Sequence, residues 1–163
     1  MRREDDTVDF DAKNVMEKII EKTKRNALIM QDNFPYNEID GKYQYAKLNA
    51  WTNGFWPGLL WQVYDICRDE SLKNTAQNCE EKLDAVINNN TVPGHDVGFI
   101  WLLTSGQNYK ITKNKKSKRR LMQMADYLAG RFNIAGNYIR AWDCEDGNDF
   151  FPCLAIIDCT MNL

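Results

Sequence analysis

Several features that identify common protein classes are absent from this sequence. Its 163 residues include a single histidine, and no apolar run approaches the roughly 18 residues that a membrane-spanning helix needs. The sequence contains neither a phosphate-binding Walker loop nor a GxGxxG fingerprint. We therefore expect neither a metal site built from several histidines nor a nucleotide site of these two kinds.

A large charge imbalance is also absent. Lys and Arg number 21 against 23 Asp and Glu, which gives a net charge of -2. A protein that binds nucleic acid by neutralising phosphates needs a basic excess, so this class is not expected. With 44% hydrophobic and 27% charged residues, the composition is typical of a soluble globular protein. The length predicts that residues 1–163 form one unit.

Cysteine usage and the N-terminal residues bear on location. The five cysteines are an odd number without a CxxC pair, which favours reduced thiols over a disulfide framework. Residues 1–10 lack the apolar stretch of a secretory signal. We therefore predict a cytoplasmic protein that does not associate with membranes.

Apolar residues recur at helical spacing along most of the chain, in two patterns that alternate. Gly54–Cys67 and Val97–Leu103 are apolar almost all round, which indicates helices buried on several sides. Asp11–Met30, Ser71–Asn88 and Lys115–Phe132 are apolar along one face, which indicates helices at the surface. This alternation predicts stacked helical hairpins and an all-α fold.

Other segments lack a helical period. Asp32–Ala50 is rich in polar and aromatic residues with one proline and one glycine, so we expect a long irregular connection. Tyr138–Trp142 is compatible with a short extended piece. The basic run Lys110–Arg120 predicts a turn and the exposed start of a helix. The acid-rich stretch Asp143–Asp149 lacks the acid spacing of an EF-hand, so we expect a solvated loop without calcium.

The only histidine, His95, follows a Pro-Gly turn and precedes Asp96 at the start of a buried helix. Asp96 has two interpretations that the sequence leaves open. Its carboxylate either caps the helix that follows, or lies in a pocket where it takes part in acid–base chemistry. His95 is equally compatible with a turn residue whose hydrogen bonds are satisfied.

A second acidic residue, Asp158, lies in the otherwise apolar stretch Leu154–Leu163. A carboxyl group that loses solvation has a raised pKa unless partners keep it ionised, and this is how a carboxylic acid remains a proton donor near neutral pH. The alternative is a helix cap after Ile157. Here too the sequence leaves both interpretations open.

Tryptophan is frequent in and beside the buried segments. Core packing is its usual role. Flat apolar faces beside carboxylates also suit the stacking of sugar rings, whose hydroxyl groups need polar partners. Trp51 and Trp142 flank the buried helices on the loop side, so they are the candidates for stacking.

Four motifs together resemble a known family. They are Trp51–Trp61 (WTNGFWPGLLW), His95–Phe99 (HDVGF), Ile139–Trp142 (IRAW) and Ile156–Leu163 (IIDCTMNL). In order and approximate spacing they are similar to glycoside hydrolase family 88, the unsaturated glucuronyl hydrolases. Each motif alone is weak, whereas the set covers most of the chain from Trp51 onward and is specific.

The resemblance implies an (α/α)6 barrel of six helical hairpins, of which this chain carries about the first half. It also implies a reaction on oligosaccharides left by polysaccharide lyases, whose terminal uronic acid has a C4=C5 double bond. A carboxyl group protonates C4 and water adds at C5, after which the hemiketal rearranges and the glycosidic bond breaks. No metal or organic cofactor is implied.

Residue roles follow from the same resemblance. Asp158 matches the general acid and base, and Asp96 matches a second aspartate that holds the sugar and stabilises the charged transition state. His95, Trp51 and Trp142 match positions that line the sugar subsite. The expected partner is an unsaturated oligosaccharide.

Family members are considerably longer, and the sequence stops five residues after Asp158 on an apolar stretch. We therefore expect the N-terminal part of a larger domain, with exposed inner helices that favour self-association. Two alternatives are an unsaturated rhamnogalacturonyl hydrolase, and an inactive fragment or non-catalytic helical module that binds sugar or protein.

Overall fold

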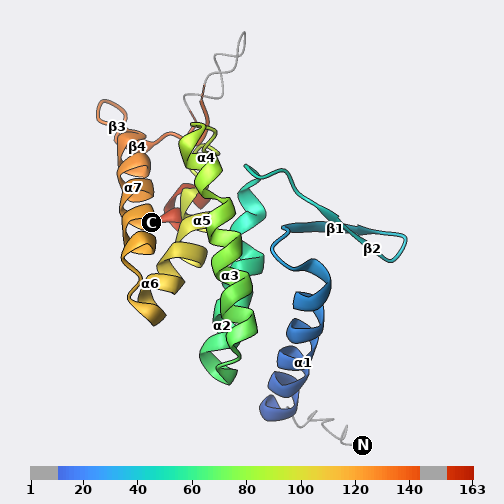
Figure 1. The fold of residues 1–163 in the computed structure, drawn as a ribbon. Helices are drawn as coiled ribbons and strands as arrows, with labels where there is room; N and C mark the ends of the chain where they lie inside the picture. Colours follow the sequence, from blue (N-terminus) through green and yellow to red (C-terminus); the bar gives the residue numbers. More distant parts are fainter. Residues whose placement is uncertain (1–10, 144–153) are drawn as a thin grey trace, which may run out of the picture.

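The computed structural model describes residues 11–143 and 154–163 as a stack of helices with small hairpins attached (Figure 1). The α-helices are α1 (Ala12–Met30), α2 (Phe55–Cys67), α3 (Glu70–Lys82), α4 (Asp84–Asn88), α5 (Val97–Trp101), α6 (Gln107–Thr112) and α7 (Lys115–Gly130). The shorter helical segments are the 3-10 helices η1 (Trp51–Gly54) and η4 (Ile157–Asn162) and the π-helical turn η2 (Leu102–Gly106). The strands are β1 (Pro35–Ile39), β2 (Lys42–Tyr45), β3 (Phe132–Asn133) and β4 (Tyr138–Ile139).

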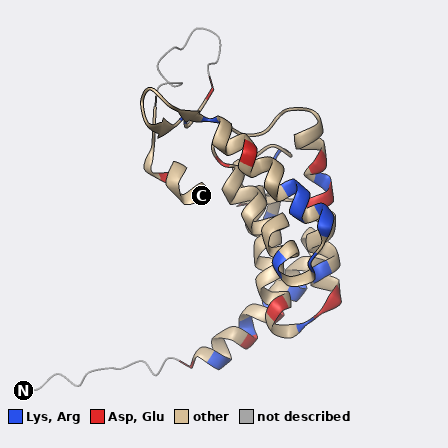
Figure 2. Cartoon of the chain, turned by 90° about the vertical axis from the view of Figure 1, so that its left-hand side faces the viewer, with Lys and Arg blue, Asp and Glu red and all other residues tan. Residues whose placement is uncertain are grey.

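The two helix types predicted from the sequence occupy different layers. Leu60 and Trp61 of α2 and Ile100 of α5 are fully buried, so α2 and α5 form the inner part of the described fold. Helices α3 and α7 pack against them with one apolar face each, and charged residues of both signs intermingle along the helices (Figure 2). None of the described helices is both long and apolar enough to cross a membrane.

Helix ends differ modestly from the predicted ranges. The buried helix that begins at Val97 runs on through η2 and α6 to Thr112, well beyond the expected end. The surface helix expected over 71–88 is divided at Leu83 into α3 and α4. Apolar periodicity marks the buried face of a helix but does not fix its ends, because fraying and capping decide those.

Two glycines, Gly54 directly before α2 and Gly58 within it, let the inner helices lie in close contact. A Cβ atom on Gly54 would lie 1.8 Å from the carbonyl oxygen of Phe99, and one on Gly58 would lie 3.0 Å from the Cβ of Leu103. Glycine has no Cβ, so the start of α2 can touch the backbone of α5. The Trp51–Trp61 motif thus contains the glycine that contacts the backbone of α5 and fixes the position of that helix.

The prediction of an irregular connection over 32–50 is wrong for its central part. Strands β1 and β2 form an antiparallel hairpin that projects away from the helices (Figure 1). Asp40 and Gly41 form its turn, with φ angles of 50° and 76°. An Asp-Gly pair tolerates positive φ at both positions and therefore favours a two-residue hairpin. Strand β4 confirms a short extended piece near Tyr138.

A buried network of charged and polar side chains connects α3 to α6 and α7. Glu80 is 1% exposed and accepts hydrogen bonds from Ser105 Oγ at 2.7 Å and Asn108 Nδ2 at 2.6 Å. Arg120 Nη1 lies 3.1 Å from the same carboxylate, and its other nitrogens bind Asp84. The basic run is therefore not wholly exposed, because Arg120 turns inward to pair with Glu80.

Helix α3 begins at a cap that also binds α1. Asp69 accepts a hydrogen bond from the backbone N–H of Ser71 at 3.0 Å, and Lys24 Nζ lies 2.8 Å from its carboxylate. The hydrogen bond from Lys24, followed by those from Ser71, lowers the pKa of Asp69 to about 2. The cysteines Cys67, Cys79 and Cys159 are free thiols, as predicted, and Cys144 and Cys153 lie outside the described residues.

Candidate active site

His95 is held at the centre of the site by the backbone of a distant segment. Its backbone N–H and its Nδ1 both face the carbonyl oxygen of Ala141, at 3.2 Å and 2.5 Å. Gly94 makes this approach possible, because its φ is 41° and a Cβ there would lie 2.8 Å from the same carbonyl oxygen. The side chain of His95 is consequently buried, with 1% of the residue exposed.

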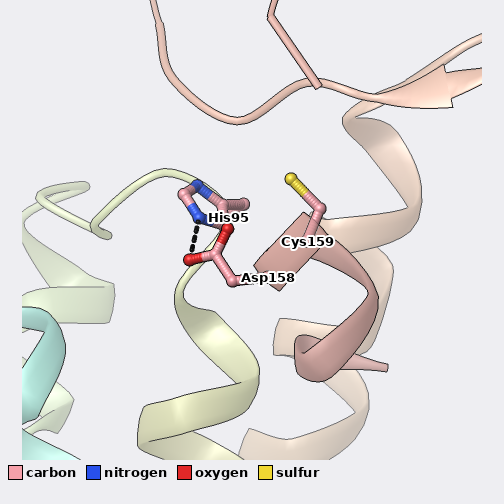
Figure 3. A group of neighbouring side chains, drawn as sticks. All are labelled: His95, Asp158 and Cys159. Atoms are coloured by element: carbon pink, nitrogen blue, oxygen red, sulfur yellow. Dashed lines mark hydrogen bonds and ion pairs between the residues drawn. The ribbon is translucent and has the colours of Figure 1, made fainter. Parts of the chain in front are cut away.

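The other ring nitrogen of His95 faces two carboxylates. Nε2 lies 3.2 Å from Asp158 Oδ2 (Figure 3) and 3.4 Å from Asp96 Oδ1. The Asp96 side chain is 16% exposed and that of Asp158 is 38% exposed. Asp96 and Asp158 therefore meet on one edge of a single imidazole, and the more exposed of the two is Asp158.

The structure excludes one of the two interpretations that the sequence leaves open for each aspartate, namely the helix cap. Asp96 occupies the N-cap position of α5, yet its side chain makes no capping hydrogen bond. Asp158 lies inside the first turn of η4, whose N-cap residue is Ile156. Neither carboxylate caps a helix, because each faces His95 instead.

Asn162 places the segment that carries Asp158. Its Nδ2 donates a hydrogen bond to the carbonyl oxygen of Asp158 at 3.0 Å, and its Oδ1 accepts one from the backbone N–H of Phe99 at 2.9 Å. Gly98 allows this contact, since a Cβ there would lie 2.3 Å from the carbonyl oxygen of Asn162. Residues 98 and 99, close behind Asp96, thus position the second aspartate.

Electrostatics at the site favour retention of a proton. Burial raises the pKa of Asp96, and the nearby charge of Asp158 raises it further, whereas His95 and Arg131 act in the opposite direction. Arg131 is itself fixed, with Nε donating to the carbonyl oxygen of Arg140 at 2.9 Å and Nη1 bound to Asp143. Two acids that share one partly buried site cannot both ionise as freely as in water.

Trp142 completes the neighbourhood of His95. The two rings meet edge to face, with centroids 5.7 Å apart and planes at 84°, and Trp142 is 37% exposed. Trp51 is 47% exposed and packs against Phe55 and Phe99, with centroids 5.9 Å and 6.0 Å away. It joins the site through Phe99, with no direct contact to His95 among those described.

Three side chains at the site are of the kinds that bind metal ions. Donor atoms of His95, Asp158 and Cys159 all lie within 4.8 Å of one another, and Figure 3 shows the three neighbouring side chains. Imidazole, carboxylate and thiolate are ligands that zinc accepts. In this structure Nε2 of His95 faces Asp158 Oδ2 at 3.2 Å. That the protein needs no cofactor stays a prediction.

The structure thus brings together four of the five residues singled out from the sequence, namely Asp96, Asp158, His95 and Trp142. The roles of Asn162 and of the Ala141 carbonyl were not anticipated. Both positions lie within the motifs, but a backbone carbonyl has no signal in the sequence, and an asparagine that bridges two segments is recognised only in three dimensions.

Comparison with known proteins supplies further evidence. No protein-family model matches the chain. The chain is 31% identical over 150 residues to the unsaturated glucuronyl hydrolase of Bacillus sp. (strain GL1), covering 86% of this chain and 38% of that protein. It is 31% identical over 157 residues to the unsaturated chondroitin disaccharide hydrolase of Streptococcus agalactiae serotype III, covering 91% of this chain and 38% of that protein.

Solved structures agree with these relatives. The crystal structure of the unsaturated glucuronyl hydrolase from Bacillus sp. GL1 matches 92% of this chain, with a TM-score of 0.83, 25% identity and 40% of that chain covered. The enzyme from Streptococcus agalactiae matches 92% of this chain and 39% of its own, with a TM-score of 0.78 and 30% identity. This sequence thus spans about two fifths of the length of its relatives.

Proposed function

Because the chain belongs to the unsaturated glucuronyl hydrolases and carries part of their six-hairpin α/α barrel, we propose that the site around Asp96 and Asp158 hydrates unsaturated uronic acids. The observation that carries the proposal is the convergence of both carboxylates on Nε2 of His95, at 3.4 Å and 3.2 Å. The substrate is an oligosaccharide whose terminal sugar has a C4=C5 double bond. The product is the released uronic acid.

The two acids take different roles because their surroundings differ. Asp158 is the more exposed and is the general acid that protonates C4, and its carboxylate then accepts a proton from the water that adds at C5. Asp96 is the more buried and stabilises the positive charge that develops at C5, which is worth more in a site that excludes water. The hemiketal formed at C5 then opens and releases the rest of the oligosaccharide.

Substrate class and sugar contacts follow from the relatives and from the exposed rings. Several relatives are named for chondroitin disaccharides, and a mutant of the Streptococcus agalactiae enzyme was solved with dGlcA-GalNAc6S. We therefore take a chondroitin-derived unsaturated disaccharide as the first substrate to test. Trp142 and Trp51 are partly exposed and are the rings available to the sugar, whereas His95 is 1% exposed and offers it almost no surface.

An apolar groove supports the proposal that further helices complete the barrel. Between α5 and α7 lies a groove of about 170 Å³, lined chiefly by Val97, Trp101, Leu121, Met124 and Leu128. In the relatives, more than half of the chain has no counterpart here. We propose that equivalent helices cover this groove in a complete barrel, and that the isolated chain self-associates through it. A cytoplasmic location stays a prediction.

The decisive experiment follows the ultraviolet absorbance of an unsaturated chondroitin disaccharide in the presence of the purified chain. The absorbance falls as the double bond is hydrated. We expect a fall with the parent chain and none with Asp158→Asn, while Asp126→Asn, which changes an exposed aspartate of α7, behaves as the parent. No fall with the parent chain would contradict the proposal for this chain.

Binding measurements separate the remaining alternatives. Calorimetry with unsaturated and saturated disaccharides would show binding without turnover if the chain were a non-catalytic module. A comparison of chondroitin-derived with pectin-derived disaccharides would identify an unsaturated rhamnogalacturonyl hydrolase. The relatives named above favour the chondroitin-derived sugar.

A further inference from the structure

The position of one proton on His95 follows directly from its partner. A carbonyl oxygen only accepts hydrogen bonds, so the 2.5 Å contact between Nδ1 and the carbonyl oxygen of Ala141 requires a hydrogen on Nδ1. This fixes the ring orientation, and Nε2 is left facing the two carboxylates. The assignment rests on the identity of the acceptor atom, so it needs no assumption about acidity.

Between Nε2 and the two carboxylates there is then no hydrogen available for a hydrogen bond. A neutral ring with hydrogen on Nδ1 has a lone pair on Nε2, and an ionised carboxylate has only lone pairs to offer. At 3.2 Å from Asp158 Oδ2 and 3.4 Å from Asp96 Oδ1, three acceptors would face one another. One additional proton removes the conflict, either on Nε2 or on one of the carboxyl groups.

We propose that His95 holds this additional proton on Nε2 in the resting site and thereby positions Asp158. An imidazole binds a proton more tightly than an aspartate carboxylate does in model peptides. Both carboxylates lie within 3.4 Å of the charge that results, and the Ala141 carbonyl stabilises it from the other side. The trio of His95, Asp96 and Asp158 then carries one net negative charge.

Other charged and titratable groups near the ring come from several elements. Arg131, at the end of α7, influences Asp96 and is itself paired with Asp143. The thiol of Cys159, on η4, lies within 4.8 Å of the donor atoms of His95 and Asp158. Arg131 carries a fixed positive charge and is paired with Asp143, so of these two groups only the Cys159 thiol can exchange a proton.

The mechanistic consequence rests on the proposed function. The proton that reaches C4 comes from Nε2. The Nε2–H bond breaks as Asp158 Oδ2 takes the proton and passes it to C4, which leaves a neutral ring and an ionised Asp158. When water adds at C5, its proton passes to Asp158 and returns to Nε2. His95 is thus a positioning residue and a proton store that acts through Asp158.

Nuclear magnetic resonance tests the inference without any turnover. His95 is the only histidine in the sequence, so the imidazole nitrogen signals of the 15N-labelled chain belong to it alone. At pH 7 we expect the chemical shifts of two protonated nitrogens. In Asp158→Asn, an amide N–H donates to Nε2 and one carboxylate is gone, so Nε2 should show the shift of a bare nitrogen while Nδ1 stays protonated.

Controls make each outcome informative. Asp126→Asn should leave both nitrogens as in the parent, and the unchanged Nδ1 signal shows that the site of each variant is folded. A bare Nε2 in the parent, or a proton on Nε2 but not on Nδ1, would overturn the inference. Protonated Nε2 in a chain that does not consume the disaccharide would leave the inference intact and contradict only the proposed function.

Discussion

Substitution of Gly98 by alanine tests how the site is assembled. The new Cβ would lie 2.3 Å from the carbonyl oxygen and 2.4 Å from the Cα of Asn162, whereas ordinary van der Waals contacts begin at 3.4 Å. Both atoms belong to backbone, so the change cannot be absorbed by a side-chain rotation. The segment η4, which carries Asp158, has to move away from α5 by about 1 Å.

Two opposing free-energy changes determine the net effect of Gly98→Ala on the docking of η4. Alanine is a better helix former than glycine by up to about 1 kcal/mol, which stabilises α5 slightly. The shift of η4 breaks the hydrogen bond from Phe99 N–H to Asn162 Oδ1 and leaves the buried Asn162 without that partner, which costs about 1–3 kcal/mol. Docking of η4 should therefore weaken by about 1–2 kcal/mol.

Hydrogen exchange of the Phe99 amide measures this docking. Phe99 is the third residue of α5, where the backbone N–H has no partner within its own helix. Its protection therefore depends on Asn162, and a loss of 1–2 kcal/mol corresponds to exchange that is roughly 5–30 times faster. Gly130→Ala is the matched control, because a Cβ there meets nothing within 4 Å. Equal protection of Phe99 in both variants would refute the reasoning.

Three further predictions concern the scaffold. Glu80→Gln should lower the free energy of unfolding in urea by about 1–3 kcal/mol, because Arg120, whose side chain is 12% exposed, loses the buried carboxylate of Glu80. Glu81→Gln at the exposed neighbouring position should have little effect. The lowered pKa of Asp69 means that its ion pair with Lys24 contributes stability above pH 4 and loses it as the pH falls towards 2, so Asp69→Asn should flatten the stability curve in that range. Burial raises the pKa of Cys79 to about 12, so alkylation of this thiol, followed by peptide mass spectrometry, should occur only on unfolding. Rapid alkylation of the native chain would contradict its burial.

Local patterns in the sequence were enough to predict the helical architecture. The all-round apolar run from Gly54 to Cys67 and the one-sided pattern over 115–132 predict an inner and a surface helix, and α2 and α7 confirm them. The hairpin at Asp40–Gly41 was missed although its turn signal is present. Its strands are exposed, and β1 lacks the hydrophobic alternation that marks a half-buried strand.

What the sequence determined was the set of candidate residues and the family that its motifs resemble. It left open whether Asp96 and Asp158 cap helices or face a pocket, since both roles use the same residue type at the start of a helix. Tertiary structure excluded the capping role and brought Asp158 to His95 across 63 residues of chain. The close approach depends on glycines at 94 and 98, on the Ala141 carbonyl and on Asn162, whose joint effect exists only once the segments are packed.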